Sequence, residues 1–336
     1  MDTPIVLSHQ TACLFYRTDH AVARGAIPSA GRASAPNAGI ENAPTASDRS
    51  LTPRRATSAV KELLQSLGVA EAELNTVHLA VGAGRVHRPT SGLVRHALRE
   101  RVLAAHAVEV AKGIRVVDPS LLFIQAAQWM DFLQLGEFGY ELSGDYRLGP
   151  SGTGYARAKP LVDPAALSSL LSTTFKRCKG SHRASGALRY IRGGSRSPME
   201  TALAMLICLP QNLGGLGIND IELNYRIDIV GPAQALTKSE YFEIDLYHPA
   251  SRRGAEYDGW DHAEAKRREH DAERRNALEE MGVYYKTLTA GQFNNQLSLH
   301  RAMNAIAHSF GVEAPTSKEF QTRQNELREF LIRNWT

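Results

Sequence analysis

Residues 241–258 read YFEIDLYHPASRRGAEYD and contain two runs of strand length, Tyr241–Leu246 and another around Ala255–Asp258. Each run is rich in aromatic and branched residues or bounded by turn-forming ones, as β-strands are. Asp245 closes the first run and Glu256 lies in the second. If the two strands pair, these acids lie on neighbouring strands of one sheet. The stretch therefore predicts a sheet whose carboxylates are placed near strand ends, where α/β proteins bind ligands.

The residues on either side predict the rest of an α/β/α arrangement. Ser197-Pro198-Met199-Glu200 places serine at the N-cap, proline at N1 and glutamate at N3, and an apolar helical run follows. Residues 221–230 and 283–288 are typical of strands, and residues 261–281 of a charged helix. The order helix, strands, helix, strand predicts a sheet covered by helices on both faces. Two helices are expected to close the chain, the last from a capping box at Thr316-x-x-Glu319.

The first half of the chain predicts a smaller α+β domain. Ile5–Leu7 is expected to form a strand, with Ser8 capping a short helix. A second helix is expected to end at Gly68, and Thr76–Val81 to form a strand. Residues 121–135 are apolar enough to predict one buried helix.

A length of 336 residues favours two folded units over one core. Large apolar residues are almost absent from residues 21–55, which predicts a linker, and a Lys/Arg/Gly/Ser-rich stretch at 177–196 indicates a second boundary. The expected parts are an N-terminal strand and helix segment at 1–20, a flexible Ala/Ser/Pro-rich linker at 21–57, an α+β domain at 58–185 and an α/β/α domain at 186–336.

Composition indicates an ordinary globular protein. Hydrophobic residues make up 43% and charged residues 22%, which excludes disordered and collagen-like chains, and the net charge of +4 is too small to indicate a polyanion partner alone. Cys13, Cys178 and Cys208 lack the spacing of a zinc site or disulfide framework. No apolar run approaches the length of a membrane span, so we expect no membrane partner and a cytoplasmic location.

Five motifs in this order resemble the PD-(D/E)XK nuclease superfamily, most closely its branch related to very short patch repair endonucleases. They are Ser197-Pro198-Met199-Glu200, Glu243-Ile244-Asp245, Glu256-Tyr257-Asp258-Gly259 with His262, Asp271-Ala272-Glu273-Arg274, and Leu278-Glu279-Glu280-Met281-Gly282. The resemblance implies a restriction-endonuclease-like α/β/α domain that hydrolyses DNA phosphodiester bonds, with a role in bacterial defence or DNA processing.

The resemblance also implies a metal site. Glu200, Asp245 and Glu256 would hold Mg²⁺ or Mn²⁺, since carboxylate oxygens suit these hard cations and a bound ion activates water near neutral pH. The implied catalytic residues are Glu200, Asp245, Glu256, Asp258 and His262.

One motif position differs from the superfamily. Its lysine, two residues after the second strand acid, is replaced here by Asp258. Lys266 or Lys286 would have to supply the positive charge, or His262 would have to act as acid or base. The expected nucleic-acid contacts are Arg274, Lys266, Lys286, Arg192 and Arg196, with Arg274 binding a phosphate or a carboxylate.

Other interpretations of these residues stay open. Glu200 has a structural explanation as the partner of Ser197 in a capping box, and Asp258-Gly259 is also typical of a tight turn. Val6–Ala12 and Gly113–Pro119 resemble AbiEi-type antitoxin proteins, which implies a toxin or defence-system partner. The alternative function is therefore a non-catalytic DNA-binding regulator or antitoxin that retains a nuclease-like fold. A scaffold that binds no nucleic acid is the third hypothesis.

Overall fold

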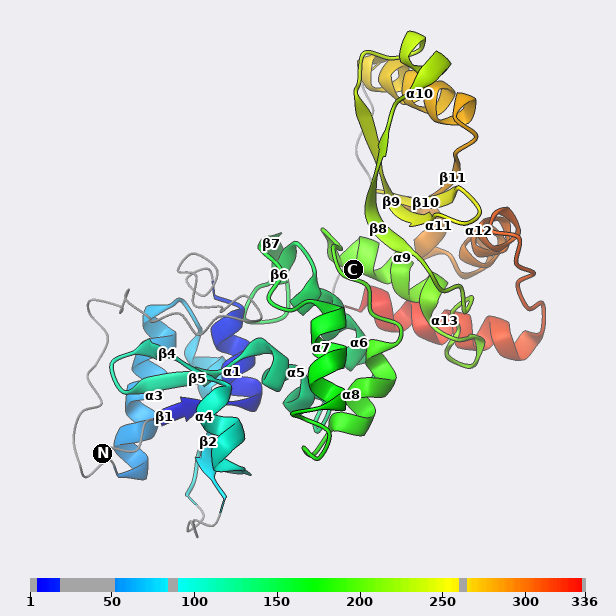
Figure 1. Ribbon diagram of the computed structural model, residues 1–336. Helices are drawn as coiled ribbons and strands as arrows, with labels where there is room; N and C mark the ends of the chain where they lie inside the picture. Colours follow the sequence, from blue (N-terminus) through cyan, green and yellow to red (C-terminus); the bar gives the residue numbers. More distant parts are fainter. Residues whose placement is uncertain (1–4, 19–51, 84–89, 260–264, 334–336) are drawn as a thin grey trace. The chain divides into compact units, whose positions relative to one another are not determined.

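The computed structural model describes residues 5–18, 52–83, 90–259 and 265–333 (Figure 1). The chain divides into two compact units. The first comprises Met1–Leu142 with Arg147–Arg189, and the second Ser143–Tyr146 with Tyr190–Thr336. Both contain helices and strands, so the expected α/β fold class with two parts is confirmed. Within the described ranges, no helix is long and apolar enough to cross a lipid bilayer.

The first unit is built on a five-stranded sheet in the order β3-β2-β1-β5-β4. The strand expected near the N-terminus, β1, is its central strand and pairs antiparallel with β2 and parallel with β5. The strands are β1 (Ile5–Leu7), β2 (Val77–Gly82), β3 (Leu93–Leu98), β4 (Ala107–Ala111) and β5 (Ile114–Val117). A separate two-stranded sheet pairs β6 (Tyr146–Leu148) with β7 (Tyr155–Arg157).

The helices of this unit include α1, with Ser8 at its N-cap position but without a capping hydrogen bond from the Ser8 side chain. They also include α3, which is followed by Gly68 in a left-handed conformation (φ +86°). The expected linker extended to residue 57, whereas α3 already begins at Pro53 behind the cap Thr52. The helices are α1 (His9–Tyr16), α3 (Pro53–Ser66), η1 (Glu71–Leu74), α4 (Glu100–Ala105), α5 (Pro119–Ala126), α6 (Phe132–Ser143), α7 (Pro164–Ser172) and α8 (Ser181–Leu188).

The expected single helix over residues 121–135 is wrong, because α5 ends at Ala126 and α6 starts at Phe132. Asp131 and Gln134 explain the break. The Asp131 N–H donates to Gln134 Oε1 at 2.9 Å and the Gln134 N–H donates to Asp131 Oδ1 at 2.8 Å. This reciprocal pair satisfies the free amides of a new helix start. The apolar run predicted the burial of residues 121–127 correctly, whereas Trp129 and Phe132 are only half-buried, and it missed the capping residues inside it.

The stretch at 177–196 contains α8, and the boundary between the two units falls within it, between Arg189 and Tyr190. Arg183 on this helix donates to the carbonyl oxygens of Ala127 (2.8 Å) and Met130 (2.7 Å), which follow α5. Arg183 thus ties α8 to the segment that follows α5.

The second unit contains a four-stranded sheet in the order β11-β10-β9-β8. β9 runs antiparallel to both of its neighbours, and β10 and β11 are parallel. The chain order α9, β8, β9, β10, α10, β11 is the expected one, with α9 (Pro198–Cys208), β8 (Glu222–Asp228), β9 (Tyr241–His248), β10 (Arg253–Asp258), α10 (Ala265–Glu280) and β11 (Tyr284–Thr289).

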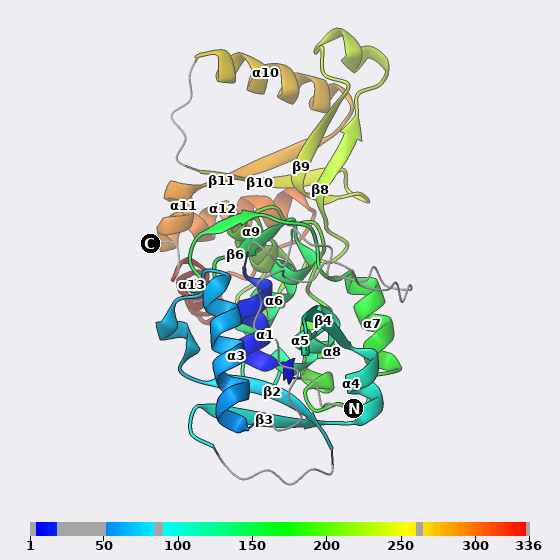
Figure 2. The same cartoon turned by 90° about the vertical axis from the view of Figure 1, so that its left-hand side faces the viewer.

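Helices cover this sheet on both sides (Figure 1, Figure 2). α9 contacts β9 and β10, while Ala277 and Leu278 of α10 pack in one apolar cluster with Phe242 and Ile244 of β9. The remaining elements are η2 (Gln211–Leu213), η3 (Gly231–Ala235), α11 (Ala290–Asn294), α12 (Gln296–Ser309) and α13 (Lys318–Ile332).

The end of the chain differs from expectation in two details. Three helices follow β11 rather than two. The last is capped by Ser317, whose Oγ accepts from the Phe320 N–H at 3.2 Å, and not by Thr316. Both residue types cap well, so the sequence alone did not separate them. Phe320, Leu327 and Leu331 of this helix are buried.

Candidate active site in the second unit

Glu200 lies in the first turn of α9 and forms hydrogen bonds with three residues. Ser197 is the N-cap, as expected, and its Oγ accepts from the Glu200 N–H at 3.1 Å. The Glu200 carboxylate does not complete a capping box with Ser197 N–H. Its Oε2 instead accepts from the Arg196 N–H and from Asn224 Nδ2 of β8, both at 2.8 Å. Glu200 therefore joins the start of the helix to the edge strand of the sheet.

Asp245 and Glu256 lie on adjacent antiparallel strands. The last regular pair of β9 and β10 is Leu246 with Ala255, so the same register continued by one residue sets Asp245 opposite Glu256. The ladder changes here, because Asp245 Oδ2 accepts from the Tyr257 N–H at 2.9 Å. A side chain thus takes the place of a backbone acceptor at the point where the two acids meet.

Arg274 of α10 donates hydrogen bonds to both carboxylate oxygens of Glu256. Its Nη1 donates to Glu256 Oε2 at 3.0 Å and its Nη2 to Glu256 Oε1. The same Nη2 reaches the backbone oxygen of Glu243 at 2.5 Å. The side chains of the pair are only 18% and 13% exposed. Arg274, expected to contact a phosphate or a carboxylate, contacts a carboxylate here.

Arg196 makes a second paired contact close to Glu200. Its two terminal nitrogens donate to the two carboxylate oxygens of Glu243 on β9 at 2.7 and 2.9 Å. The hydrogen bond from Arg196 holds the pKa of Glu243 below its usual value. This residue, expected to contact nucleic acid, therefore binds a carboxylate of its own unit.

The charges of the other two acids act on Asp245. The pKa of Asp245 is raised to about 7, mainly by burial, and the charges of Glu200 and Glu256 raise it further. The Tyr257 N–H and Arg274 act in the opposite direction. Burial also raises the pKa of Glu256, against the effect of Arg274. Asp245 is consequently a carboxyl group that titrates near neutral pH, a property that clusters at functional sites.

The donor chemistry of this cluster suits a hard divalent cation, since it consists of carboxylate oxygens. The spacing does not yet form a complete site. Within the described ranges, no group of three or more His, Cys, Asp or Glu side chains is gathered closely enough to hold a metal ion. Both oxygens of Glu256 are engaged by Arg274, whereas Asp245 uses only Oδ2 in a hydrogen bond. The charges of Glu200 and Glu256 thus act on Asp245, while the Glu256 carboxylate is bound to Arg274.

Asp258 and Arg192 are further predicted residues whose side chains the structure describes. Asp258 is exposed at the end of β10, and its negative charge is one of the smaller influences that raise the pKa of Glu256. Arg192 donates to the backbone oxygen of Ile191 at 3.1 Å. His262 lies outside the described residues, and Lys266 falls within α10, with its side chain also outside them.

Lys286 is not part of the acidic cluster. It lines a separate surface cavity of about 490 Å³ with Arg253, Tyr284 and His308. Among the described residues it forms no hydrogen bond or ion pair, and none of the three acids lines that cavity. In this conformation Lys286 does not replace the lysine of the motif.

Glu243 and Asn224 belong to the hydrogen-bond network around Glu200, and neither was given a role from the sequence. Glu243 precedes Asp245 by two positions and was part of a recognised motif, but its partner Arg196 is remote in sequence. Asn224 adopts φ +48°, a conformation that asparagine tolerates better than most residues, and only the fold shows that its amide reaches Glu200.

Comparison of the chain with known protein families, with curated proteins and with solved structures gave no match in any of the three.

Proposed function

We propose that the second unit is a metal-dependent endonuclease that hydrolyses DNA phosphodiester bonds, with Glu200, Asp245 and Glu256 as the residues that hold Mg²⁺ or Mn²⁺. The observation that carries this proposal is the environment of Asp245. Asp245 is half-buried, and this burial together with the charges of Glu200 and Glu256 raises its pKa to about 7. Like charges brought together in this way are stabilised by a bound cation. Such an ion would neutralise charge on the phosphate and lower the pKa of its bound water.

The chain's own cations fit a role in substrate binding. The guanidinium of Arg274 is planar and holds Glu256 through two hydrogen bonds, a geometry that matches a phosphate as well as a carboxylate. In this proposal Arg274 exchanges Glu256 for a DNA phosphate, which frees the Glu256 carboxylate. Arg196, paired with Glu243, is a second group of the same kind.

The test is a cleavage assay on single- and double-stranded DNA with Mg²⁺ or Mn²⁺, using wild type, Asp245→Asn and Glu256→Gln. Each substitution should lower the rate by roughly a hundredfold or more, because a lost ligand removes several kcal/mol of transition-state stabilisation. Asp228→Asn is the matched control, since Asp228 is an exposed carboxylate on the same sheet paired with Arg226. A rate that neither Asp245→Asn nor Glu256→Gln changes refutes the proposal.

A second candidate is a DNA-binding regulator or antitoxin without catalysis, acting in bacterial defence with a toxin partner. Two observations favour it. Arg274 occupies both oxygens of Glu256, and Asp258 stands where the nucleases that this chain resembles carry a lysine. Calorimetric titration with Mg²⁺ separates the candidates, because the regulator retains DNA in a salt-dependent manner without binding the ion at these acids.

A further inference from the structure

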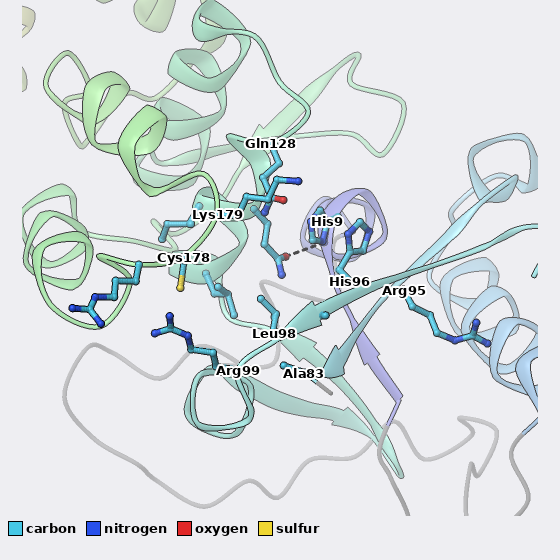
Figure 3. A pocket seen from close by; sticks show the side chains of 14 residues that line it. His9, Ala83, Arg95, His96, Leu98, Arg99, Gln128, Cys178 and Lys179 are labelled. Atoms are coloured by element: carbon cyan, nitrogen blue, oxygen red, sulfur yellow. Dashed lines mark hydrogen bonds between the residues drawn. The ribbon is translucent and has the colours of Figure 1, made fainter. Parts of the chain in front are cut away.

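The first unit contains a cavity of about 390 Å³ formed by α1, β3, α5 and the segment before α8 (Figure 3). Its volume lies within the range of small-molecule sites. His9, Gln125 and Leu121 supply part of its buried lining, and Arg99, Arg177 and Lys179 are exposed residues that also line it. The cavity therefore combines a buried polar floor with cations near solvent.

The charged residues that line this cavity are all basic. The residues that line it include arginines and a lysine and no aspartate or glutamate. Arg99, Arg177 and Lys179 form no ion pair with any described residue. In Figure 3, Arg95 extends away from the other labelled side chains, so it is not counted among the three. An anion would offset the repulsion of these cations.

A buried donor in the cavity has no partner. Gln125 is 1% exposed, and its Oε1 accepts from the His9 N–H at 3.0 Å, which fixes the amide with Nε2 as the remaining group. Gln125 Nε2 is buried and makes no hydrogen bond within the described residues. An amide N–H₂ can only donate, so it requires an acceptor. A ligand oxygen that enters the cavity would supply one.

The imidazole rings beside this donor are neutral. His9 and His96 stack with their centroids 3.4 Å apart, and the pKa of each is lowered, to about 3 for His9 and about 4 for His96. Burial is the main cause in both, and the positive charge of Lys179 is among the others. Lys179 lines the same cavity as both rings and is exposed to solvent.

We propose that this cavity binds a small phosphorylated metabolite, with Arg99, Arg177 and Lys179 around the phosphate and the amide of Gln125 donating to one of the ligand's oxygens. Three cations in a lining that contains no aspartate or glutamate match a dianion better than a single carboxylate. A small molecule fits better than a DNA backbone because the unsatisfied donor is buried. This site is separate from the proposed nuclease function, since every residue that lines it belongs to the first unit.

The test is calorimetric titration of the full chain at constant ionic strength with inorganic phosphate, adenosine 5′-monophosphate, adenosine and a short DNA duplex. Binding of one phosphate-bearing molecule per chain, with adenosine inactive, supports the proposal. Equal affinity for both phosphate probes identifies free phosphate as the ligand, and tighter binding of the nucleotide identifies an organic phosphate. Binding of adenosine as tight as that of the nucleotide, or binding of DNA alone, overturns it.

Variants locate the binding to this cavity. Lys179→Met and Arg99→Met change exposed residues and should each weaken phosphate binding by about tenfold, the effect of losing one charged hydrogen bond. Gln125→Glu, which places a carboxylate beside the phosphate, should abolish it. Lys112→Met is the matched control, because Lys112 is an exposed lysine in the turn between β4 and β5 and does not line the cavity. Unchanged affinity in both Lys179→Met and Arg99→Met overturns the proposal even if Gln125→Glu fails to fold.

Discussion

Arg274 holds Glu256 by both carboxylate oxygens, and the two residues come from different layers of the second unit. Arg274 Nη1 lies 3.0 Å from Glu256 Oε2, Nη2 donates to Oε1, and both side chains are largely buried. The pair connects α10 to β10, and Arg274 competes with any metal ion for the Glu256 carboxylate. Its strength therefore bears on both the stability and the proposed chemistry of this unit.

Replacing Arg274 by methionine should destabilise the protein by about 3 kcal/mol. The substitution keeps an apolar side chain against Phe242 and Tyr285, over whose rings the guanidinium lies, but leaves Glu256 buried without its cation. Breaking a buried pair at one partner usually costs this much, because the remaining charge is uncompensated. The free energy of unfolding in urea measures the loss.

Arg323→Met is the matched control for this loss. Arg323 pairs with Glu319 one turn away at 3.2 Å, and the side chains are 44% and 78% exposed. Solvent screens such a pair, so its removal should cost no more than about 0.5 kcal/mol. Similar losses in the two variants would mean that the Arg274–Glu256 pair contributes no more than a surface contact.

Asp245 should make stability fall as the pH rises toward neutrality. Its folded-state pKa of about 7 lies above its ordinary value of 3.8, so the folded protein binds the proton more tightly than the unfolded chain does. The stability from this group is complete below about pH 4 and is lost as the pH rises through about 7. Relative to Asp245→Asn, wild type should therefore lose roughly 2–3 kcal/mol between about pH 5 and pH 8.

Unfolding free energies of wild type and Asp245→Asn at the two pH values give this difference directly. The comparison removes the contribution of all other titrating groups, because both proteins contain them. Parallel pH profiles for the two proteins would show that Asp245 ionises in the folded state as it does in the unfolded chain.

Gly254 on β10 permits the close packing of three strands. A Cβ at this position would lie 2.5 Å from Ile244 Cγ2 and 3.3 Å from Tyr285 Cβ, which are on the neighbouring strands β9 and β11. Gly254→Ala should therefore destabilise the protein by about 1–3 kcal/mol through overpacking. Gly291→Ala in α11 is the control, because no atom lies within 4 Å of its Cβ and φ is not positive there. A thermal melt in which both variants match wild type would exclude the steric explanation.

Local signals in the sequence predicted much of this fold. Ser197 before Pro198 specified the start of α9, and Gly68 followed the end of α3. These features depend on a few adjacent residues, which is why they can be recognised without the fold. The break between α5 and α6 was missed although it is also local, because the apolar residues around Asp131 dominated the pattern.

The candidate site was predictable in part. The order of Glu200, Asp245 and Glu256 along the chain indicated that they belong together, and the charges of Glu200 and Glu256 do raise the pKa of Asp245. The partners of these acids were not predictable in the same way. Asn224 reaches Glu200 and Arg274 bonds the backbone of Glu243, and such contacts depend on strand register and helix placement. Lys286 shows the converse, since its position along the chain suggested a role that its place in the fold does not support.

Asn224 should be sensitive to substitution for two separable reasons. Its Nδ2 donates to Glu200 Oε2 and to the Gly194 backbone oxygen, each at 2.8 Å, and its φ of +48° is unfavourable for residues with a Cβ. Asn224→Gly removes the hydrogen bonds and relieves the backbone, whereas Asn224→Ala removes them without that relief. We expect Asn224→Ala to be about 1 kcal/mol less stable than Asn224→Gly in urea unfolding, and both to be less stable than wild type. Equal stability of the two variants would show that the backbone of β8 relaxes at this residue.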